Sequence, residues 1–149
     1  MKDITLKLID LLKSGFCTPQ IARVAKKLKE PSTTIHYNIK KLEKEGAIKA
    51  YKAVFDYKKI DKGHCTYVLG NLSSDNYAEP EVVAKDIAKH DEVESIDIVT
   101  GDYEILMKLR TKDIDEYYQF VKFLIKKYGF VKTYSITSLK QVKTEFVEL

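Results

Sequence analysis

The sequence predicts an α+β protein in two parts, an N-terminal helix-turn-helix that can carry a wing and a C-terminal ferredoxin-like βαββαβ domain. Helical periodicity dominates the first 46 residues, and beyond residue 63 it gives way to alternating strands mixed with helices. The sign of the net charge also changes near residue 63. Residues 1–62 hold 15 Lys and Arg against 7 Asp and Glu, whereas residues 63–149 hold 11 against 15.

The stretch from Ser32 to Gly46 is typical of a DNA-recognition helix. Pro31 cannot lie inside a helix, the Ser32 hydroxyl can cap the first turn, and Gly46 can end the last one. The apolar residues recur at spacings of four and three, which should turn them toward a core. They are Ile35, Ile39 and Leu42.

The opposite face of this helix carries hydroxyl, phenol, imidazole and ammonium groups. Thr33, His36 and Tyr37 are candidates for base contacts, and the lysines suit phosphates. The full set of candidate DNA-binding residues is Ser32, Thr33, Thr34, His36, Tyr37, Lys40, Lys41 and Lys44. A solvated lysine-rich face has the same pattern, so the neighbouring elements must support the interpretation.

Two helices are expected before this one. Asp3 can cap the first, whose apolar stripe is Ile4, Leu8, Leu11 and Leu12. Thr18 and Pro19 can open the second, which is short and basic. Only a few residues join it to Ser32, which predicts a helix-turn-helix domain over residues 1–50.

Residues 47–56 alternate in polarity, with Tyr51, Ala53 and Phe55 on one side, which predicts a strand. This strand can be the wing of a winged helix or a connector to the next domain. Residues 57–64 then bring three lysines, a histidine and a glycine, so we expect a connector strand and hinge over residues 51–62.

The pattern of alternating runs and helical periodicity in residues 63–149 predicts an antiparallel sheet with two helices packed on it. The two helices are expected from Pro80 and over Ile114–Tyr128. Gly101 and Asp102 separate two alternating runs, which is a hairpin pattern. The expected strands cover residues 65–72, 93–100, 103–110 and 131–139, with a further candidate at 142–147.

The run IHYNIKKLEKEGAIKAY, the connector and the motif VTGDYEILMKL together resemble the Lrp/AsnC family of feast-and-famine transcription regulators. The resemblance implies binding to double-stranded DNA by a homodimer that forms through the C-terminal sheets and can assemble into tetramers or octamers. It also implies an amino acid effector near the G-D-Y turn. The residues to which it assigns this role are Thr100, Gly101, Asp102 and Tyr103, with Ser135 and Thr137 on the last strand.

Other function classes find little support. The three histidines lie in separate segments, Cys17 and Cys65 stand alone, and no P-loop or nucleophile motif occurs, so we expect no metal, cofactor or catalysis. No apolar run is long enough to span a membrane and no secretory signal is recognisable, which favours a cytoplasmic protein.

Three alternatives stay open. A winged-helix DNA binder whose C-terminal domain only dimerises would fit the same elements, as would a ferredoxin-like module for RNA or for a small molecule. RNA is disfavoured because the expected strand EILMKLR has no aromatic residue on which to stack a base. Plain turn chemistry also explains Gly101 and Asp102 without an effector.

Overall fold

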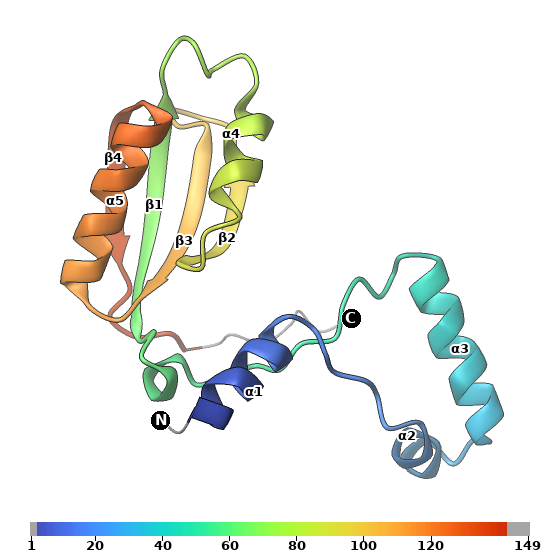
Figure 1. The fold of residues 1–149 in the computed structure, drawn as a ribbon. Helices are drawn as coiled ribbons and strands as arrows, with labels where there is room; N and C mark the ends of the chain where they lie inside the picture. The colour runs from blue at the N-terminus through green and yellow to red at the C-terminus, as the bar shows by residue number, and fades with distance from the viewer. Residues whose placement is uncertain (1–2, 143–149) are drawn as a thin grey trace. The chain divides into compact units, whose positions relative to one another are not determined.

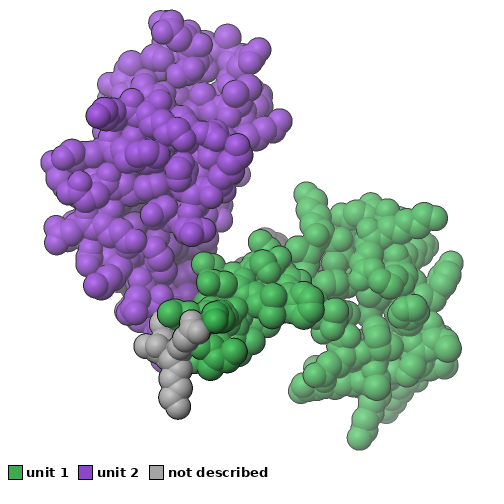
Figure 2. All heavy atoms as spheres, viewed as in Figure 1, with its two compact units in different colours: residues 1–55 green, residues 56–149 purple. Residues whose placement is uncertain are grey.

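The computed structural model describes residues 3–142. The chain divides into two compact units, Met1–Phe55 and Asp56–Leu149, which Figure 2 colours separately. The division falls inside the segment expected as a connector.

The first unit contains α1 (Asp3–Lys13), α2 (Ile21–Leu28) and α3 (Ser32–Lys44), labelled in Figure 1. Ala25 of α2 and Ile35 of α3 are buried. The link between these helices is short because Lys29 adopts a left-handed conformation, with φ of 57°, at the end of α2. The expected helix-turn-helix is therefore present.

Two helix starts differ from prediction. Gln20, not Thr18, is the N-cap of α2, and Pro31, not Ser32, is the N-cap of α3. The carbonyl oxygen of Pro31 accepts the first helical hydrogen bond, from the Ile35 N–H at 3.1 Å. Because Pro31 is already extended, with ψ of 141°, α3 can begin directly after it and no side-chain cap forms.

The apolar stripe of α1 is largely exposed in the single chain, and only Leu12 is half-buried. Ile4 is 70% exposed and Leu8 is 52% exposed. Leu42 of α3 is also exposed. A unit of this size has too little interior to cover all its apolar side chains, so part of its apolar surface stays accessible.

The predicted connector strand is wrong for the single chain. Residues 49–56 form no strand, and the chain then enters a short 3-10 helix, η1 (Tyr57–Ile60), capped by Asp56. A strand exists only where a neighbour supplies a hydrogen-bonding ladder. Within residues 3–142 no segment pairs with this one, so no wing forms either.

The second unit has the expected ferredoxin-like plan. Its four strands, all antiparallel to their neighbours, lie in the order β2-β3-β1-β4. The strands are β1 (His64–Leu72), β2 (Val93–Ile98), β3 (Ile105–Thr111) and β4 (Phe130–Thr137). The helices α4 (Pro80–Ile87) and α5 (Ile114–Tyr128) lie on one face of this sheet (Figure 1). The additional strand considered at 142–147 lies, beyond Val142, outside the described residues.

The core of this unit lies between the sheet and the two helices. Its most deeply buried apolar residues are Val68, Ile87, Ile105, Met107, Leu109 and Leu124. Neither α4 nor α5 lies on the other face of the sheet. Tyr134 and Ile136 on that face are 54% and 49% exposed, so the sheet has an apolar side that its own helices do not cover.

Candidate nucleic-acid interface and effector turn

The outward face of α3 is accessible along its whole length. All eight candidate DNA-binding residues from Ser32 to Lys44 are exposed, and Tyr37 reaches 69%. The side chains of Lys40 and Lys41 are 62% and 58% exposed. Ile35 lies on the opposite side of the helix and is buried. The helix therefore presents its hydroxyls near its N-terminus and its lysines toward its C-terminus.

Glu43 organises the C-terminal half of this face. Its carboxylate accepts a hydrogen bond from the Lys40 ammonium at 2.7 Å and another from the Tyr51 hydroxyl at 3.1 Å. The bond from Lys40 lowers the pKa of Glu43, and the pKa of Lys40 is raised in return. Lys40 is exposed and Glu43 is only half-buried, so this ion pair is weak and Lys40 can be shared with a phosphate.

Lys41 and Lys44 complete the basic side of α3. Lys41 lies 3.9 Å from Glu45, a long contact between exposed groups. Lys44 has no ion-pair partner among residues 3–142. Two of the three lysines of α3 thus form weak ion pairs with nearby glutamates, and the third has no ion pair within the part of the chain that the structure describes.

The hairpin turn between β2 and β3 is tied to two other strands. Gly101 has φ of +114°, a conformation that a side chain would strain. The Asn71 amide of β1 donates to the Asp102 carbonyl at 2.5 Å, and the Lys132 ammonium of β4 lies 5.4 Å from the ring centroid of Tyr103. The turn is therefore held at one end of the sheet.

Glu104 fixes the start of β3 beside this turn. Its carboxylate accepts a hydrogen bond from the Leu72 N–H at 2.9 Å. Its own N–H donates to the carbonyl oxygen of Gly70 at 3.2 Å. These two hydrogen bonds hold Glu104 against β1, so the backbone of the adjoining turn residues Asp102 and Tyr103 is also held in place.

The other two candidate effector residues lie elsewhere in the single chain. In the register of β1 and β4, Lys132 pairs with Asn71 near the turn, whereas Ser135 pairs with Val68 and Thr137 with Thr66, further along the strands. The Tyr117 hydroxyl of α5 donates to Ser135 at 2.5 Å. Within one chain the structure does not bring Ser135 and Thr137 to the turn.

Comparison with known proteins gives the family of this fold. A family model described as the Lrp/AsnC ligand binding domain matches residues 67–147, more than half of the chain. The chain belongs to the Lrp/AsnC family.

The relatives of this Lrp/AsnC protein are named as transcriptional regulators. A Pyrococcus abyssi protein described as an HTH-type transcriptional regulator is 32% identical over 126 residues, 84% of each chain. The regulatory protein AsnC of Haemophilus influenzae is 31% identical over 110 residues, 74% of this chain and 71% of its own. The chain is therefore a transcription regulator of the helix-turn-helix type.

Solved structures share the fold of this family member. An AsnC family transcriptional regulator from Agrobacterium tumefaciens superposes with a TM-score of 0.77 at 24% identity, covering 100% of this chain and 96% of its own. A Neisseria meningitidis transcriptional regulator crystallised with L-Met superposes with a TM-score of 0.73 at 16% identity, covering 97% and 93%.

Sequence reasoning missed several residues of this Lrp/AsnC chain that shape the two surfaces. Glu43 escaped notice although its spacing of three from Lys40 is the spacing of a helical ion pair. Asn71, Glu104 and Lys132 reach the turn only through strand pairing between distant segments. Nothing local in the sequence marks those three.

Two further properties bear on function. Among residues 3–142 no three potential metal ligands gather at one place. In the same part of the chain, no helix has the length and apolar character that crossing a bilayer requires.

Proposed function

We propose that this regulator binds double-stranded DNA through the outward face of α3 and that a small amino acid bound at the turn of residues 100–103 modulates it. The observation that supports DNA binding most directly is the exposure of every polar candidate on α3 in the basic half of the chain. A surplus of positive charge attracts the phosphate backbone whatever the sequence.

Within this proposal some residues of α3 contact base edges and others contact phosphates. Thr33, His36 and Tyr37 lie toward the N-terminal half of the helix, where a major-groove helix contacts base edges. Ser32 and Thr34 supply hydroxyls at the helix start. Lys40, Lys41 and Lys44 contact phosphates, which position the helix without reading sequence.

The proposed DNA-binding species is a homodimer. The open face of the sheet, with Tyr134 and Ile136, offers apolar area for a second copy. The exposed stripe of α1 offers more. Residues 49–56 alternate like a strand yet lack a ladder, and pairing with the same residues of a second copy would supply one. Two recognition helices related by twofold symmetry would then read half-sites about one helical turn, or a multiple of it, apart.

The proposed effector contacts follow from the chemistry of the turn. The Asp102 carboxylate can receive an α-ammonium, and backbone N–H groups of Thr100 and Gly101 can receive an α-carboxylate. The Neisseria meningitidis regulator of the same fold was crystallised with L-Met, which supports an amino acid as the class of ligand.

Two experiments test the proposal. Selection of duplexes from a random DNA library should enrich a site with twofold symmetry, and failure to enrich any site would contradict sequence-specific binding. Thermal denaturation with each proteinogenic amino acid should show a raised melting temperature for at least one, because a ligand bound only by the folded state stabilises it. If none does, the alternative holds in which the second unit only dimerises.

A further inference from the structure

A groove of about 470 Å³ lies between α4 and the C-terminal end of α5, and none of its lining residues belongs to the turn of residues 100–103. Pockets for small molecules have volumes of about 300–1,000 Å³, so the groove has the size of a ligand site. The residues that line it are Val82, Val83, Lys85, Asp86, Lys89 and Tyr128.

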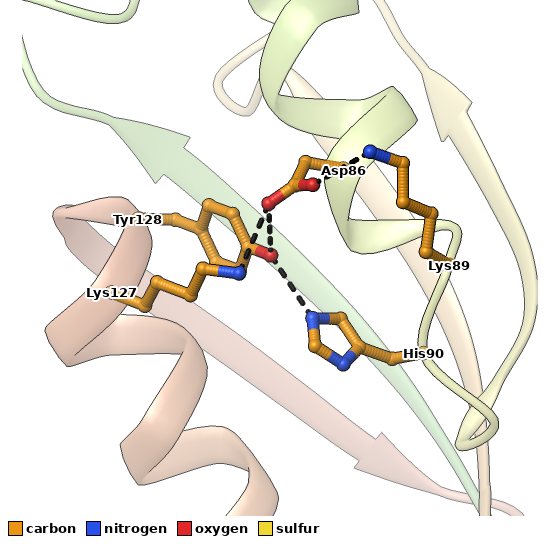
Figure 3. Close-up of polar contacts among 5 residues, drawn as sticks. All are labelled: Asp86, Lys89, His90, Lys127 and Tyr128. Carbon is orange, nitrogen blue, oxygen red and sulfur yellow. Dashed lines mark hydrogen bonds and ion pairs between the residues drawn. The ribbon is translucent and has the colours of Figure 1, made fainter.

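A hydrogen-bonded network joins α4 to α5 (Figure 3), and three of its members, Asp86, Lys89 and Tyr128, line the groove. Asp86 of α4 accepts hydrogen bonds from the Lys89 ammonium at 3.0 Å, from the Lys127 ammonium at 3.0 Å and from the Tyr128 hydroxyl at 2.9 Å. These bonds hold the pKa of the Asp86 carboxyl well below its usual range. Asp86 is therefore ionised and acts only as an acceptor.

The ionised state of Asp86 decides which group donates in the hydrogen bond between His90 and Tyr128. Burial raises the pKa of Tyr128, so its hydroxyl keeps its single proton and donates it to Asp86. The Tyr128 oxygen must then accept from Nε2 of His90, 3.0 Å away, which places a proton on that nitrogen. His90 is itself held edge-on against Phe123, with ring centroids 5.2 Å apart. The network is thus ordered around the Asp86 carboxylate, and the Lys89 and Lys127 ammoniums keep further N–H groups for other acceptors.

The rim of the groove carries an uncompensated positive charge. Among residues 3–142, Asp86 is the one carboxylate in the lining, and the Lys89 and Lys127 ammoniums already share it. Lys85 also lines the groove and has no ion-pair partner among residues 3–142. The Lys89 side chain is 74% exposed, so a bound anion can share its ammonium with Asp86.

Beside these ammoniums the groove has an apolar wall. Val82 is 61% exposed and Val83 is buried, and both line the groove. An exposed valine that lines a concave surface next to two lysines offers methyl contacts to a ligand that is charged at one end and apolar at the other.

We propose that this groove binds a small aliphatic carboxylate, with its anionic group between Lys85 and Lys89 and its apolar tail on Val82 and Val83. The site is separate from the effector turn of residues 100–103, and the proposal does not rest on that role. A ligand here would touch both α4 and α5 and so add a connection between the two helices that back the sheet.

The test is a titration of the full-length protein with isocaproate, followed by NMR of the valine methyl groups. We expect saturable shifts at Val82 and Val83 and weaker or no binding of the uncharged isocaproamide. Replacing both lysines, Lys85→Gln with Lys89→Gln, should weaken binding about tenfold, because two exposed charge contacts are lost. Lys112→Gln, an exposed lysine before α5, and Asp102→Ala, in the turn, should leave the affinity unchanged.

Three outcomes would overturn the proposal. They are the absence of saturable shifts in the unmodified protein, equal affinity for the amide, and an unchanged affinity in the double variant. The amide spectrum of the double variant checks its fold, and exposed lysines at these positions are not needed for folding. The valine shifts should persist in Asp102→Ala even if that variant loses every response to amino acids, which separates this site from the effector turn.

Discussion

The guanidinium of Arg110 stacks on the ring of Tyr57, with its central carbon 4.1 Å from the ring centroid. Tyr57 begins η1 directly after the boundary between the units, and Arg110 lies on β3 with only 5% of its surface exposed. The Nε of Arg110 also donates to Glu94 of β2 at 2.5 Å, and its terminal nitrogen donates to Gln141. Arg110 therefore holds η1, the first helical segment of the second unit, against the open face of the sheet.

Replacing Arg110 tests this anchor. Arg110→Ala should lower the free energy of unfolding by about 1–3 kcal/mol, because the buried guanidinium loses its stacking on Tyr57 and its hydrogen bonds, whereas Glu94 keeps its ion pair with Lys108 at 2.8 Å. Urea denaturation followed by circular dichroism measures the change. Lys112→Ala, at an exposed neighbouring position, should change it by less than about 0.5 kcal/mol. A loss no larger for Arg110→Ala than for this control would show that the stacked guanidinium adds nothing.

Gly70 tests the packing of β1 against β4. A Cβ at this position would lie 2.5 Å from Cε1 of the buried Phe130 ring. Gly70→Ala should therefore destabilise the second unit by about 1–3 kcal/mol through overpacking. Adding Phe130→Leu removes the ring, so the double variant should lose less stability than the sum of the single losses. Additive losses would mean that the two positions do not collide.

The ionised state of Asp86 predicts a specific pH dependence. Its pKa in the folded protein lies below the unfolded value of about 3.9, so its contribution to stability is present above that pH and is lost as pH falls toward the folded value. Asp86→Asn should therefore flatten the decline of unfolding free energy below about pH 4. Thermal melts between neutral and strongly acidic pH measure this. Asp97→Asn serves as the matched control on β2, and equal slopes in all three proteins would contradict the prediction.

Two residues of α3 should affect DNA binding in different ways. Lys40→Ala should weaken binding to all sequences alike and reduce the slope of log affinity against log salt by about one, as expected for one lost phosphate contact. Tyr37→Ala should mainly relax sequence preference. Fluorescence anisotropy with a selected operator and a scrambled duplex, at several salt concentrations, distinguishes the two effects.

The matched control for this pair is Lys112→Ala, which removes an exposed lysine of the acidic second unit and should leave affinity, salt slope and preference as they are. Unchanged operator affinity in both Lys40→Ala and Tyr37→Ala would mean that another surface contacts DNA.

Much of the fold follows from local patterns. The alternation on each side of Gly101 specifies a hairpin, and Ile114–Tyr128 has a helical stripe ended by Gly129, so these elements agree with their prediction closely. The exposed face of α3 was also predictable, because a helix with one apolar stripe must turn its other side to solvent. These features depend on residues only a few positions apart.

Helix starts were harder to predict than helix bodies. Thr18 and Ser32 each have the chemistry of a cap, yet the structure places the caps at Gln20 and Pro31. Several neighbouring residues can cap a helix, and small differences in free energy decide among them. The strand expected over residues 47–56 is absent for another reason: alternation predicts an extended segment but does not supply a neighbouring strand with which it can pair.

By itself the sequence determined the type of most elements, their order and the basic character of the first unit, because periodicity and charge are local properties of a chain. Tertiary structure alone decided which distant side chains meet. Asn71 and Lys132 come to the turn at Asp102 through strand register, and Asp86 meets Tyr128 through helix packing. Such contacts join residues some 30 or more positions apart, and their geometry follows from how the sheet and helices pack rather than from any neighbouring residue.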